Sequence, residues 1–235
     1  MRKFILAAAV VCISLLNSCK KDEQPSYPAL KDYFPLQVGK YVTYNLDSIV
    51  FYTNFGVSAV IHSYQVKHVV DAQVTDALGR PAYRIIRYIR SYSTAPWVAD
   101  NTFMAVNTGS SIEYTENNLR FIKLVDPIRQ DYTWQGNKYI DVTSSSSQVK
   151  YFDGWDYAYD SVNTRTQVGA LSIDSTIKVT EIDNQTSIDR TYSMEKYAKG
   201  IGLVYRNFLY WNNGTANHTY TDNSYGVIMT MIDHN

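Results

Sequence analysis

Cysteine is nearly absent from this sequence, which has only Cys12 and Cys19 among its 235 residues. Both lie near the start, so the rest of the chain offers no thiol nucleophile and no pair of cysteines for a disulfide. A domain without disulfides has to be stabilised by a packed core, and roughly two hundred residues are enough to build one. We therefore expect a single domain with a hydrophobic core.

Motifs of common enzyme classes are also missing. No Gly-x-Ser-x-Gly nucleophile motif occurs in the chain. The segment Gly200-Ile201-Gly202 lacks the third glycine of a dinucleotide-binding loop. We interpret it as a bulge or a close crossing of two backbones. These absences predict that the protein is not an enzyme and needs no cofactor.

The four histidines do not form a metal site. His62 and His68 fall on one face of a predicted strand, but they are six residues apart, about 20 Å along an extended chain. They cannot bind one metal ion together, and we expect them to be core or cavity-wall residues. His218 and His234 lack the spacing of zinc ligands. The sequence thus predicts no metal centre.

The charges give no sign of a basic surface. The chain has 22 basic and 22 acidic residues, and its first 18 positions carry two basic residues and no acidic one. Without those positions the net charge is about −2. This balance argues against nucleic acid as a partner. Beyond the N-terminus, no apolar run is long enough to cross a membrane as a helix.

The N-terminus itself has the pattern of an export signal. Two basic residues precede an apolar run over residues 4–16, which is too short to span a bilayer stably. The run ends in Leu16-Asn17-Ser18-Cys19 and resembles the lipobox of bacterial lipoproteins. The resemblance implies cleavage before Cys19, acylation of its thiol with palmitate-type chains, and acylation of the new amino terminus. Several acyl chains give durable membrane attachment. The alternative is an ordinary secretory signal that contains a cysteine.

The residues after Cys19 bear on the location of the protein. Lys20 stands where Asp would signal retention in the inner membrane, and lysine followed by acids resembles the surface-export signal of Bacteroidota lipoproteins. The alternative is a solvated charged tether. We expect a signal peptide at residues 1–18, a flexible acylated tether at 19–32, and attachment to the outer membrane. The protein would then be surface-exposed or face the periplasm.

The remaining residues, 33–235, read as one domain of β-strands. In residues 171–180, for example, Ile173, Ile177 and Val179 alternate with polar side chains. Tyr, Thr, Ser and Val are abundant and Glu is scarce, which favours strands. The sequence predicts an all-β fold, a long antiparallel meander that forms a curved sheet, half-barrel, barrel or sandwich. The expected strands are residues 41–52, 60–74, 82–92, 97–106, 112–115, 119–125, 155–159, 171–180, 200–211 and 225–232.

Little helix is expected outside the signal peptide. Residues 110–114 admit two interpretations. Asn117 and Asn118 predict a tight hairpin turn just after them, whereas Ser110 and Glu113 would suit the cap of a short helix. Residues 195–199 are the other candidate for a helical turn.

Four short motifs resemble a set of uncharacterised Bacteroidota lipoproteins. They are Phe-Pro-Leu-Gln-Val-Gly at residues 34–39, Trp-Gln-Gly-Asn at 134–137, Lys-Gly-Ile-Gly-Leu-Val-Tyr at 199–205 and Tyr-Gly-Val-Ile at 225–228. The family usually has a tryptophan where Tyr41 or Val42 stands here. The resemblance implies a curved antiparallel sheet similar to that of the carriers LolA and LolB, and it implies no activity.

Aromatic side chains are the strongest sequence signal for a ligand. Tyr and Trp offer stacking faces and a polar tip, which suit sugars and lipids. The candidate ligand contacts are Tyr205, Tyr210, Trp211 and Tyr220, which crowd the last predicted hairpin. The alternative is that these rings fill the two faces of a twisted sheet.

Three tripeptides that begin with Asp-Ser look like the O-glycosylation sites of Bacteroidota. They make Ser48, Ser161 and Ser175 the candidate modified residues. Glycosylation requires that such a site be exposed. The alternative is that these serines are ordinary polar residues of strands.

Together these observations favour a membrane-anchored, non-enzymatic lipoprotein that binds an apolar or glycan ligand. One alternative is a structural or interaction lipoprotein that docks to an outer-membrane protein. Another is a glycan hydrolase, for which Asp153 and Asp156 beside Trp155 are the candidate acids.

Overall fold

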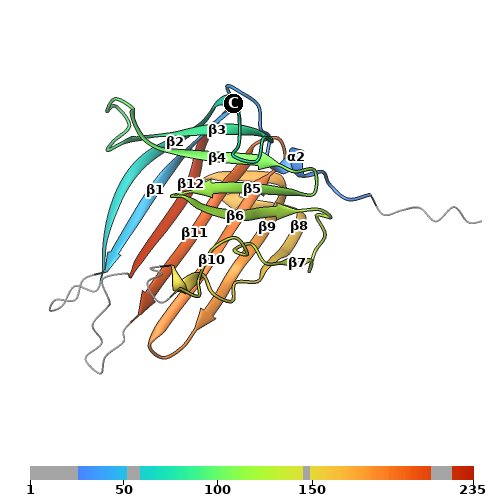
Figure 1. Ribbon diagram of the computed structural model, residues 1–235. Helices are drawn as coiled ribbons and strands as arrows, with labels where there is room; N and C mark the ends of the chain where they lie inside the picture. The colour runs from blue at the N-terminus through green and yellow to red at the C-terminus, as the bar shows by residue number, and fades with distance from the viewer. Residues whose placement is uncertain (1–25, 52–58, 145–148, 213–223) are drawn as a thin grey trace, which may run out of the picture.

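The computed structural model describes residues 26–51, 59–144, 149–212 and 224–235, and nearly all of its regular structure is β. Twelve strands form one antiparallel sheet in the order β6-β5-β4-β3-β2-β1-β12-β11-β10-β9-β8-β7 (Figure 1). This confirms the predicted all-β fold, with a single sheet in place of the two sheets of a sandwich. The elements are α2 (Leu30–Tyr33), β1 (Tyr41–Phe51), β2 (Ala59–Thr75), β3 (Pro81–Arg90), β4 (Val98–Asn107), β5 (Ser111–Glu116), β6 (Leu119–Val125), β7 (Thr133–Trp134), the short 3-10 helix η1 (Lys150–Phe152), β8 (Tyr157–Val168), β9 (Leu171–Gln185), β10 (Asp189–Ala198), β11 (Gly202–Asn212) and β12 (Tyr225–His234).

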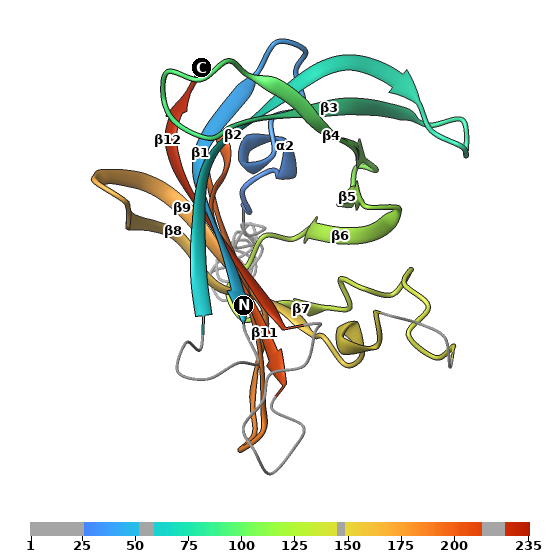
Figure 2. The same cartoon turned by 90° about the vertical axis from the view of Figure 1, so that its left-hand side faces the viewer.

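The sheet is a meander that coils on itself. Each described strand pairs with the next one in sequence, except that β6 and β7 form the two ends of the sheet. The first and last strands also pair, so that Leu46 of β1 lies opposite Met229 of β12. Large sheets curl because every strand pair adds to the same right-handed twist. In Figure 2, β5 and β6 stand opposite β1 and β11. The result is a nearly closed, barrel-like sheet.

Individual hydrogen bonds close the sheet next to its edge strand β6. The N–H of Ile122 donates to the carbonyl of Gly136 at 2.8 Å, and the indole N–H of Trp134 donates to the carbonyl of Ile122 at 2.8 Å. The Tyr159 hydroxyl donates to the carbonyl of Val125 and accepts from the N–H of the same residue. These bonds satisfy backbone groups that an open edge would leave unpaired.

The Trp-Gln-Gly-Asn segment has a structural role at this closure. Gly136 lies against the ring of Tyr157, where an added Cβ would come within 2.4 Å of a ring carbon, so a larger residue does not fit. Asn137 accepts a hydrogen bond from the Tyr157 hydroxyl at 2.9 Å and donates one to the carbonyl of Phe152 at 3.1 Å. The motif therefore holds β8 and η1 together.

The chain before β1 packs against the interior side of the sheet. Leu30 and Tyr33 of α2 are 5% and 0% exposed. Phe34 contacts the rings of Tyr114 and Tyr197, each with a centroid separation of 6.0 Å. The predicted tether extended to residue 32, whereas residues 30–32 lie in α2. Leu30 and Tyr33 are three residues apart, so one turn of helix buries both side chains on the same face.

The predicted backbone crossing at residues 200–202 is present. The N–H of Gly200 donates to the carbonyl of Asp32 at 2.6 Å. Gly202 has a φ of 105° and faces Pro35, whose Cδ would be 3.6 Å from an added Cβ. The first motif of the domain thus lies directly on the late glycine motif.

For residues 110–114, the sequence allowed either a hairpin or a short helix, and the turn that follows them decides between the two. β5 and β6 form a hairpin through Asn117 and Asn118, whose φ angles are 51° and 62°. Asparagine tolerates these left-handed angles better than most residues do. The hairpin interpretation is confirmed.

The helical turn predicted at residues 195–199 is wrong, because Glu195 lies within β10. The sequence analysis did not detect this strand. Both of its faces are largely buried, and the buried side chains include the polar residues Thr191, Ser193 and Glu195. Polar Thr191, Ser193 and Glu195 alternate with Tyr192 and Met194, but here the polar positions are buried, so the usual pattern of a half-exposed strand, with polar residues outside, is missing.

Candidate functional site

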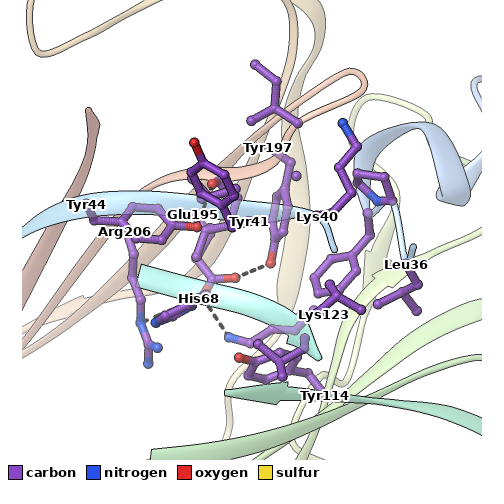
Figure 3. Close-up of a pocket in the computed structure, with 18 of the residues that line it drawn as sticks. Leu36, Lys40, Tyr41, Tyr44, His68, Tyr114, Lys123, Glu195, Tyr197 and Arg206 are labelled. Carbon is purple, nitrogen blue, oxygen red and sulfur yellow. Dashed lines mark hydrogen bonds and ion pairs between the residues drawn. The ribbon is translucent and has the colours of Figure 1, made fainter. Parts of the chain in front are cut away.

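Two neighbouring cavities lie on the interior side of the sheet. The larger has a volume of about 370 Å³, and the smaller, beneath the segment around Phe34, has a volume of about 90 Å³. Figure 3 shows the smaller cavity. Four residues, Arg87, Glu116, Arg206 and Met229, line both cavities. The larger cavity falls within the size range of small-molecule sites in proteins, about 300–1,000 Å³.

Strand register places the wall residues in rows. Arg206 of β11 stands opposite Glu195 of β10 and Met229 of β12. Two positions further along β11, Phe208 stands opposite Val227. Because successive residues of a strand point to opposite faces, every second residue of these strands faces the interior.

The wall of the larger cavity combines apolar side chains with polar groups. The polar groups are the hydroxyls of Ser48, Tyr64, Tyr151 and Tyr225, the amide of Asn117, and the charged groups shared with the smaller cavity. Asn117 is exposed and Tyr225 is 38% exposed, so the wall reaches the protein surface. The apolar and aromatic residues of the wall are Leu46, Ile89, Leu119, Phe121, Tyr151, Phe152, Phe208, Tyr225, Val227 and Met229.

A buried ion cluster spans the interior beside the smaller cavity. The ammonium of Lys123 on β6 lies 2.8 Å from a carboxylate oxygen of Glu181 on β9 and 2.9 Å from one of Glu195 on β10. The side chains of these three residues are 5%, 2% and 2% exposed. Arg206 lies 3.7 Å from Glu195 and 3.0 Å from Glu116. We call Lys123, Glu181, Glu195, Arg206 and Glu116 the interior cluster.

The two carboxyl groups bound to Lys123 have opposite pKa shifts. Burial, followed by the nearby charge of Glu195, raises the pKa of Glu181. Burial would also raise the pKa of Glu195, but the charges of Lys123 and Arg206 outweigh it and leave that pKa lowered. The charges of Glu181 and Glu195 likewise outweigh burial and raise the pKa of Lys123. Divergent pKa values in a carboxyl pair are typical of acid–base catalysis as well as of structural ion pairs.

The hydrogen bonds of these carboxylates favour the structural interpretation. Glu181 uses one oxygen for Lys123 and accepts a hydrogen bond from Ser193 at 2.6 Å with the other. Glu195 likewise uses one oxygen for Lys123 and the other for the hydroxyl of Tyr197. All four oxygens are therefore occupied by protein donors, and Glu181 lines neither cavity.

His68 lines the smaller cavity, which agrees with the prediction that it would be a core or cavity-wall residue. Its ring lies between those of Tyr44 and Phe103, at centroid separations of 5.2 and 5.3 Å. Burial lowers the pKa of His68 to about 3, so the imidazole is neutral at physiological pH. His62, by contrast, is exposed on the same strand, β2.

The predicted ligand-contacting aromatics do not form one site. Tyr210 is on the interior side, stacked on Tyr151 at a centroid separation of 5.0 Å. Tyr205 stands opposite Lys196, whose ammonium lies 5.5 Å from the ring, and lines neither cavity. Trp211 follows Tyr210 on β11 and so points to the other face. Tyr220 lies outside the described residues.

The other predicted sites lie in different parts of the chain. Ser48 lines the larger cavity, so a glycan on it would enter that cavity. Ser161 and Ser175 are half-buried on β8 and β9. Cys19 and the signal peptide lie outside the described residues. Asp153 and Asp156 are exposed, and Trp155 between them is buried in the core.

The sequence analysis missed the charged residues of the interior. Glutamate occurs only five times in the chain, and four of these residues, Glu113, Glu116, Glu181 and Glu195, lie in ion pairs. Lys123 lies between apolar neighbours in β6. A lysine inside the apolar predicted strand at residues 119–125 was the available signal for a buried ion pair, whereas Glu116, Glu181 and Glu195 fell outside the predicted strands.

Comparisons with known proteins give little further information. No protein-family model matches the chain, and no curated protein matches it. A search of solved structures finds the crystal structure of a predicted lipoprotein from Parabacteroides distasonis, which is 13% identical over 90% of this chain and 100% of that one, with a TM-score of 0.31. A TM-score this low does not establish a common fold. Function therefore has to be argued from the residues.

Two searches of the described residues bear on function classes. No group of three or more His, Cys, Asp or Glu side chains in this part of the chain is placed to hold a metal ion. Among the same residues, none of the helices has the length and apolar character needed to cross a membrane.

Proposed function

We propose that this protein is a bacterial lipoprotein, anchored to the outer membrane through acylated Cys19, that binds an apolar small molecule inside its curved sheet without transforming it. The observation that carries the proposal is the cavity of about 370 Å³, whose wall combines aliphatic and aromatic side chains with hydroxyl, amide and charged groups. The size is that of ligand sites in proteins, and such sites also combine apolar walls with polar groups that orient the ligand.

The curved sheet supports a role as a carrier or binding module similar to LolA and LolB. The interior faces of β1, β2, β11 and β12 contribute side chains to the cavity, and residues of β5 and β6 complete it from the opposite side. Within the interior, the carboxylates of Glu181 and Glu195 are bonded to protein donors, which favours a structural role for this acid pair. The candidate acids Asp153 and Asp156 are exposed and line neither cavity.

Native mass spectrometry of the protein, purified gently from its own envelope, tests this proposal. We expect an additional mass that is neither the acyl anchor nor a covalent glycan. The variant Val227→Trp fills the larger cavity and should lose that mass, whereas Ile232→Trp, at a 38% exposed position of the same strand that lines neither cavity, should keep it. A protein without any bound ligand would contradict the proposal and favour docking to an outer-membrane protein.

A further inference from the structure

The charged side chains that line the larger cavity are already matched in pairs. In the larger cavity the charged wall residues are Arg87, Glu116 and Arg206. Arg206 pairs with Glu116 at 3.0 Å. Arg87 donates from Nε to a carboxylate oxygen of Asp100 at 2.6 Å. Each cation of this wall therefore has its own carboxylate.

In the smaller cavity, Lys123 is held by two carboxylates, at 2.8 and 2.9 Å. The ammonium of Lys40 donates to the main-chain oxygen of Asn235 at 2.6 Å. His68 remains neutral, as described above. Among the described residues, each charged side chain of the larger cavity therefore has a partner of opposite charge.

This matching determines which ligands can enter. An ionised head group would bring an unpaired charge into a partly buried space whose wall charges are already paired, and it would lose part of its hydration without gaining a partner of opposite charge. A neutral oxygen carries no such penalty, and it can hydrogen-bond to the hydroxyls of Ser48 and Tyr64 or to the Arg206–Glu116 pair. The apolar part of the ligand would contact Leu46, Phe208 and Val227.

We propose that the larger cavity selects an uncharged amphiphile, an alkyl chain that bears a hydroxyl, ester or amide, and rejects alkyl carboxylates and alkylamines. This inference rests on the proposed function and specifies the chemical class of its ligand. Arg87 and Arg206 would be specificity-determining residues because a carboxylate balances the charge of each. The buried Nε of Arg206, which has no hydrogen-bond partner among the described residues, can donate to a neutral ligand oxygen.

The test uses the chain from residue 19 onward with Cys19→Ser, which retains every described residue and carries no acyl chains that could compete. The neutral fluorescent probe N-phenyl-1-naphthylamine is displaced by dodecanol, dodecanoate or dodecylammonium at neutral pH, below their micelle concentrations. We expect dodecanol to displace the probe at a concentration at least tenfold lower than either ion.

Two variants each remove the carboxylate partner of one wall arginine, and a third variant serves as the control. Glu116→Gln frees Arg206 from its closest partner, and Asp100→Asn does the same for Arg87 near the surface, where folding is at less risk. Each should strengthen dodecanoate binding at least tenfold and change dodecanol binding by less than threefold. Asp71→Asn disrupts the pair with Arg84, which lines neither cavity, and should change neither.

The outcomes separate the two proposals. If neither the probe nor dodecanol binds, the proposed function fails and the head-group inference falls with it. If dodecanol and dodecanoate bind equally well to the unaltered chain, the cavity is a ligand site but the inference is overturned. An unchanged preference in both Glu116→Gln and Asp100→Asn, with folding intact, would also overturn it.

Discussion

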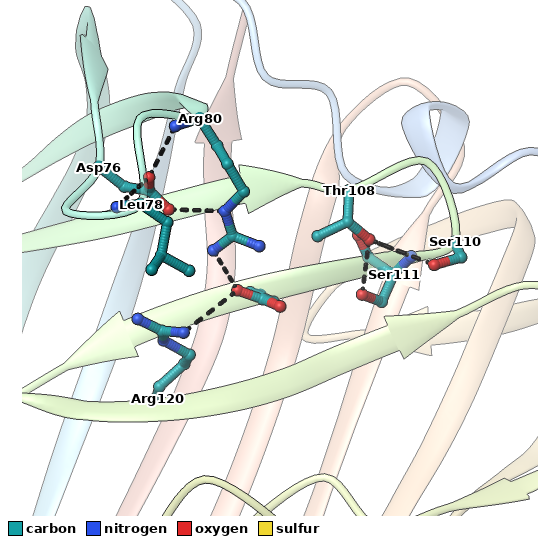
Figure 4. Close-up of polar contacts among 8 residues, drawn as sticks. Asp76, Leu78, Arg80, Thr108, Ser110, Ser111 and Arg120 are labelled. Atoms are coloured by element: carbon teal, nitrogen blue, oxygen red, sulfur yellow. Dashed lines mark hydrogen bonds and ion pairs between the residues drawn. The ribbon is translucent and has the colours of Figure 1, made fainter.

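Two ion clusters in this protein use the same chemistry in different surroundings. The interior cluster crosses from β6 to β9 and β10, and its Lys123 side chain is 5% exposed. The second, which we call the turn cluster, consists of Asp76, Arg80, Glu113 and Arg120 (Figure 4). Its two arginine side chains are 30% and 33% exposed. In the interior cluster a charge that loses its partner stays buried without compensation, whereas in the turn cluster water can solvate it.

The turn cluster is local and partly solvated. Arg80 bonds to Asp76 at 2.8 Å within the β2–β3 turn and to Glu113 of β5 at 2.7 Å. Asp76 also accepts backbone N–H bonds from Leu78 and Arg80. The backbone bond from Arg80 is the main cause of the lowered pKa of Asp76. Water can solvate the arginines if a partner is lost, whereas it cannot reach Lys123 as easily.

The largest expected effect is that of Lys123→Met. The substitution leaves the buried carboxylate of Glu181 without a cation, and it leaves Arg206 as the remaining cation near the carboxylate of Glu195. Breaking one side of a buried ion pair typically costs about 3–5 kcal/mol of unfolding free energy. Equilibrium unfolding in urea measures this loss. A loss below about 1 kcal/mol would mean that water or neighbouring groups replace the lysine, and the two clusters would then be alike.

A second change should partly reverse the first. Adding Glu181→Gln to Lys123→Met removes the uncompensated carboxylate and keeps an acceptor for the hydroxyl of Ser193. We expect the double variant to recover about 1–3 kcal/mol of the loss, in the range of coupling energies between contacting residues. The same urea experiment, completed as a double-mutant cycle, gives the coupling directly. Simple additivity of the two substitutions would contradict a direct interaction.

The pH dependence of stability should differ between the two clusters. The folded-state pKa of Glu181 is raised above its ordinary value of 4.5. The contribution of Glu181 to the free energy of unfolding is therefore fully present below about pH 4.5 and is lost as pH rises through the folded-state pKa. Asp76, with a lowered pKa, contributes above its ordinary value of 3.8 and loses this contribution as pH falls.

The variant Glu181→Gln removes the titrating group of Glu181 and so shows how much this residue contributes to the pH dependence of stability. Thermal unfolding between pH 4 and 8 should show a smaller decline of Tm with rising pH in this variant than in the unaltered protein. Asp183→Asn, at a 58% exposed side chain on the same strand, is the matched control and should keep the decline. An identical profile in all three proteins would show that Glu181 has no raised pKa.

The smallest expected effect is that of Arg120→Gln in the turn cluster. Arg120 lies 3.9 Å from Glu113, which keeps its closer bond to Arg80. Partly exposed ion pairs contribute about 0–1 kcal/mol, so the unfolding free energy should change by less than about 1 kcal/mol. A loss as large as that of Lys123→Met would remove the distinction between the two clusters.

Much of the fold could be predicted from the sequence because most strands have one exposed face. The exposed face of β9, for example, makes Ile173, Ile177 and Val179 alternate with polar residues. β10 could not be recognised, because its polar side chains are buried by partners in distant segments. The closure next to β6 likewise depends on hydrogen bonds of Trp134 and Tyr159 that have no local pattern.

The candidate site was harder to predict than the fold. Lys123 meets residues 58 and 72 positions further along the chain, and no local pattern reports such a pairing. The predicted aromatics were chosen because they are neighbours in sequence, yet alternation sends Tyr210 and Trp211 to opposite faces of β11. The strand pattern placed His62 and His68 on the same apolar face, and the expectation of a core or cavity-wall residue is confirmed for His68 but wrong for His62, which is exposed.

The central claim is that an uncharged amphiphile occupies the larger cavity. A crystal structure of the chain from residue 19 onward with Cys19→Ser, grown with a terminally brominated dodecanol, tests it most directly, because anomalous scattering locates the bromine. The account predicts a bromine peak inside the larger cavity, in contact with side chains such as Leu46, Phe208 or Val227. A peak found only on the outer surface of the sheet, or none at saturating ligand, would contradict it.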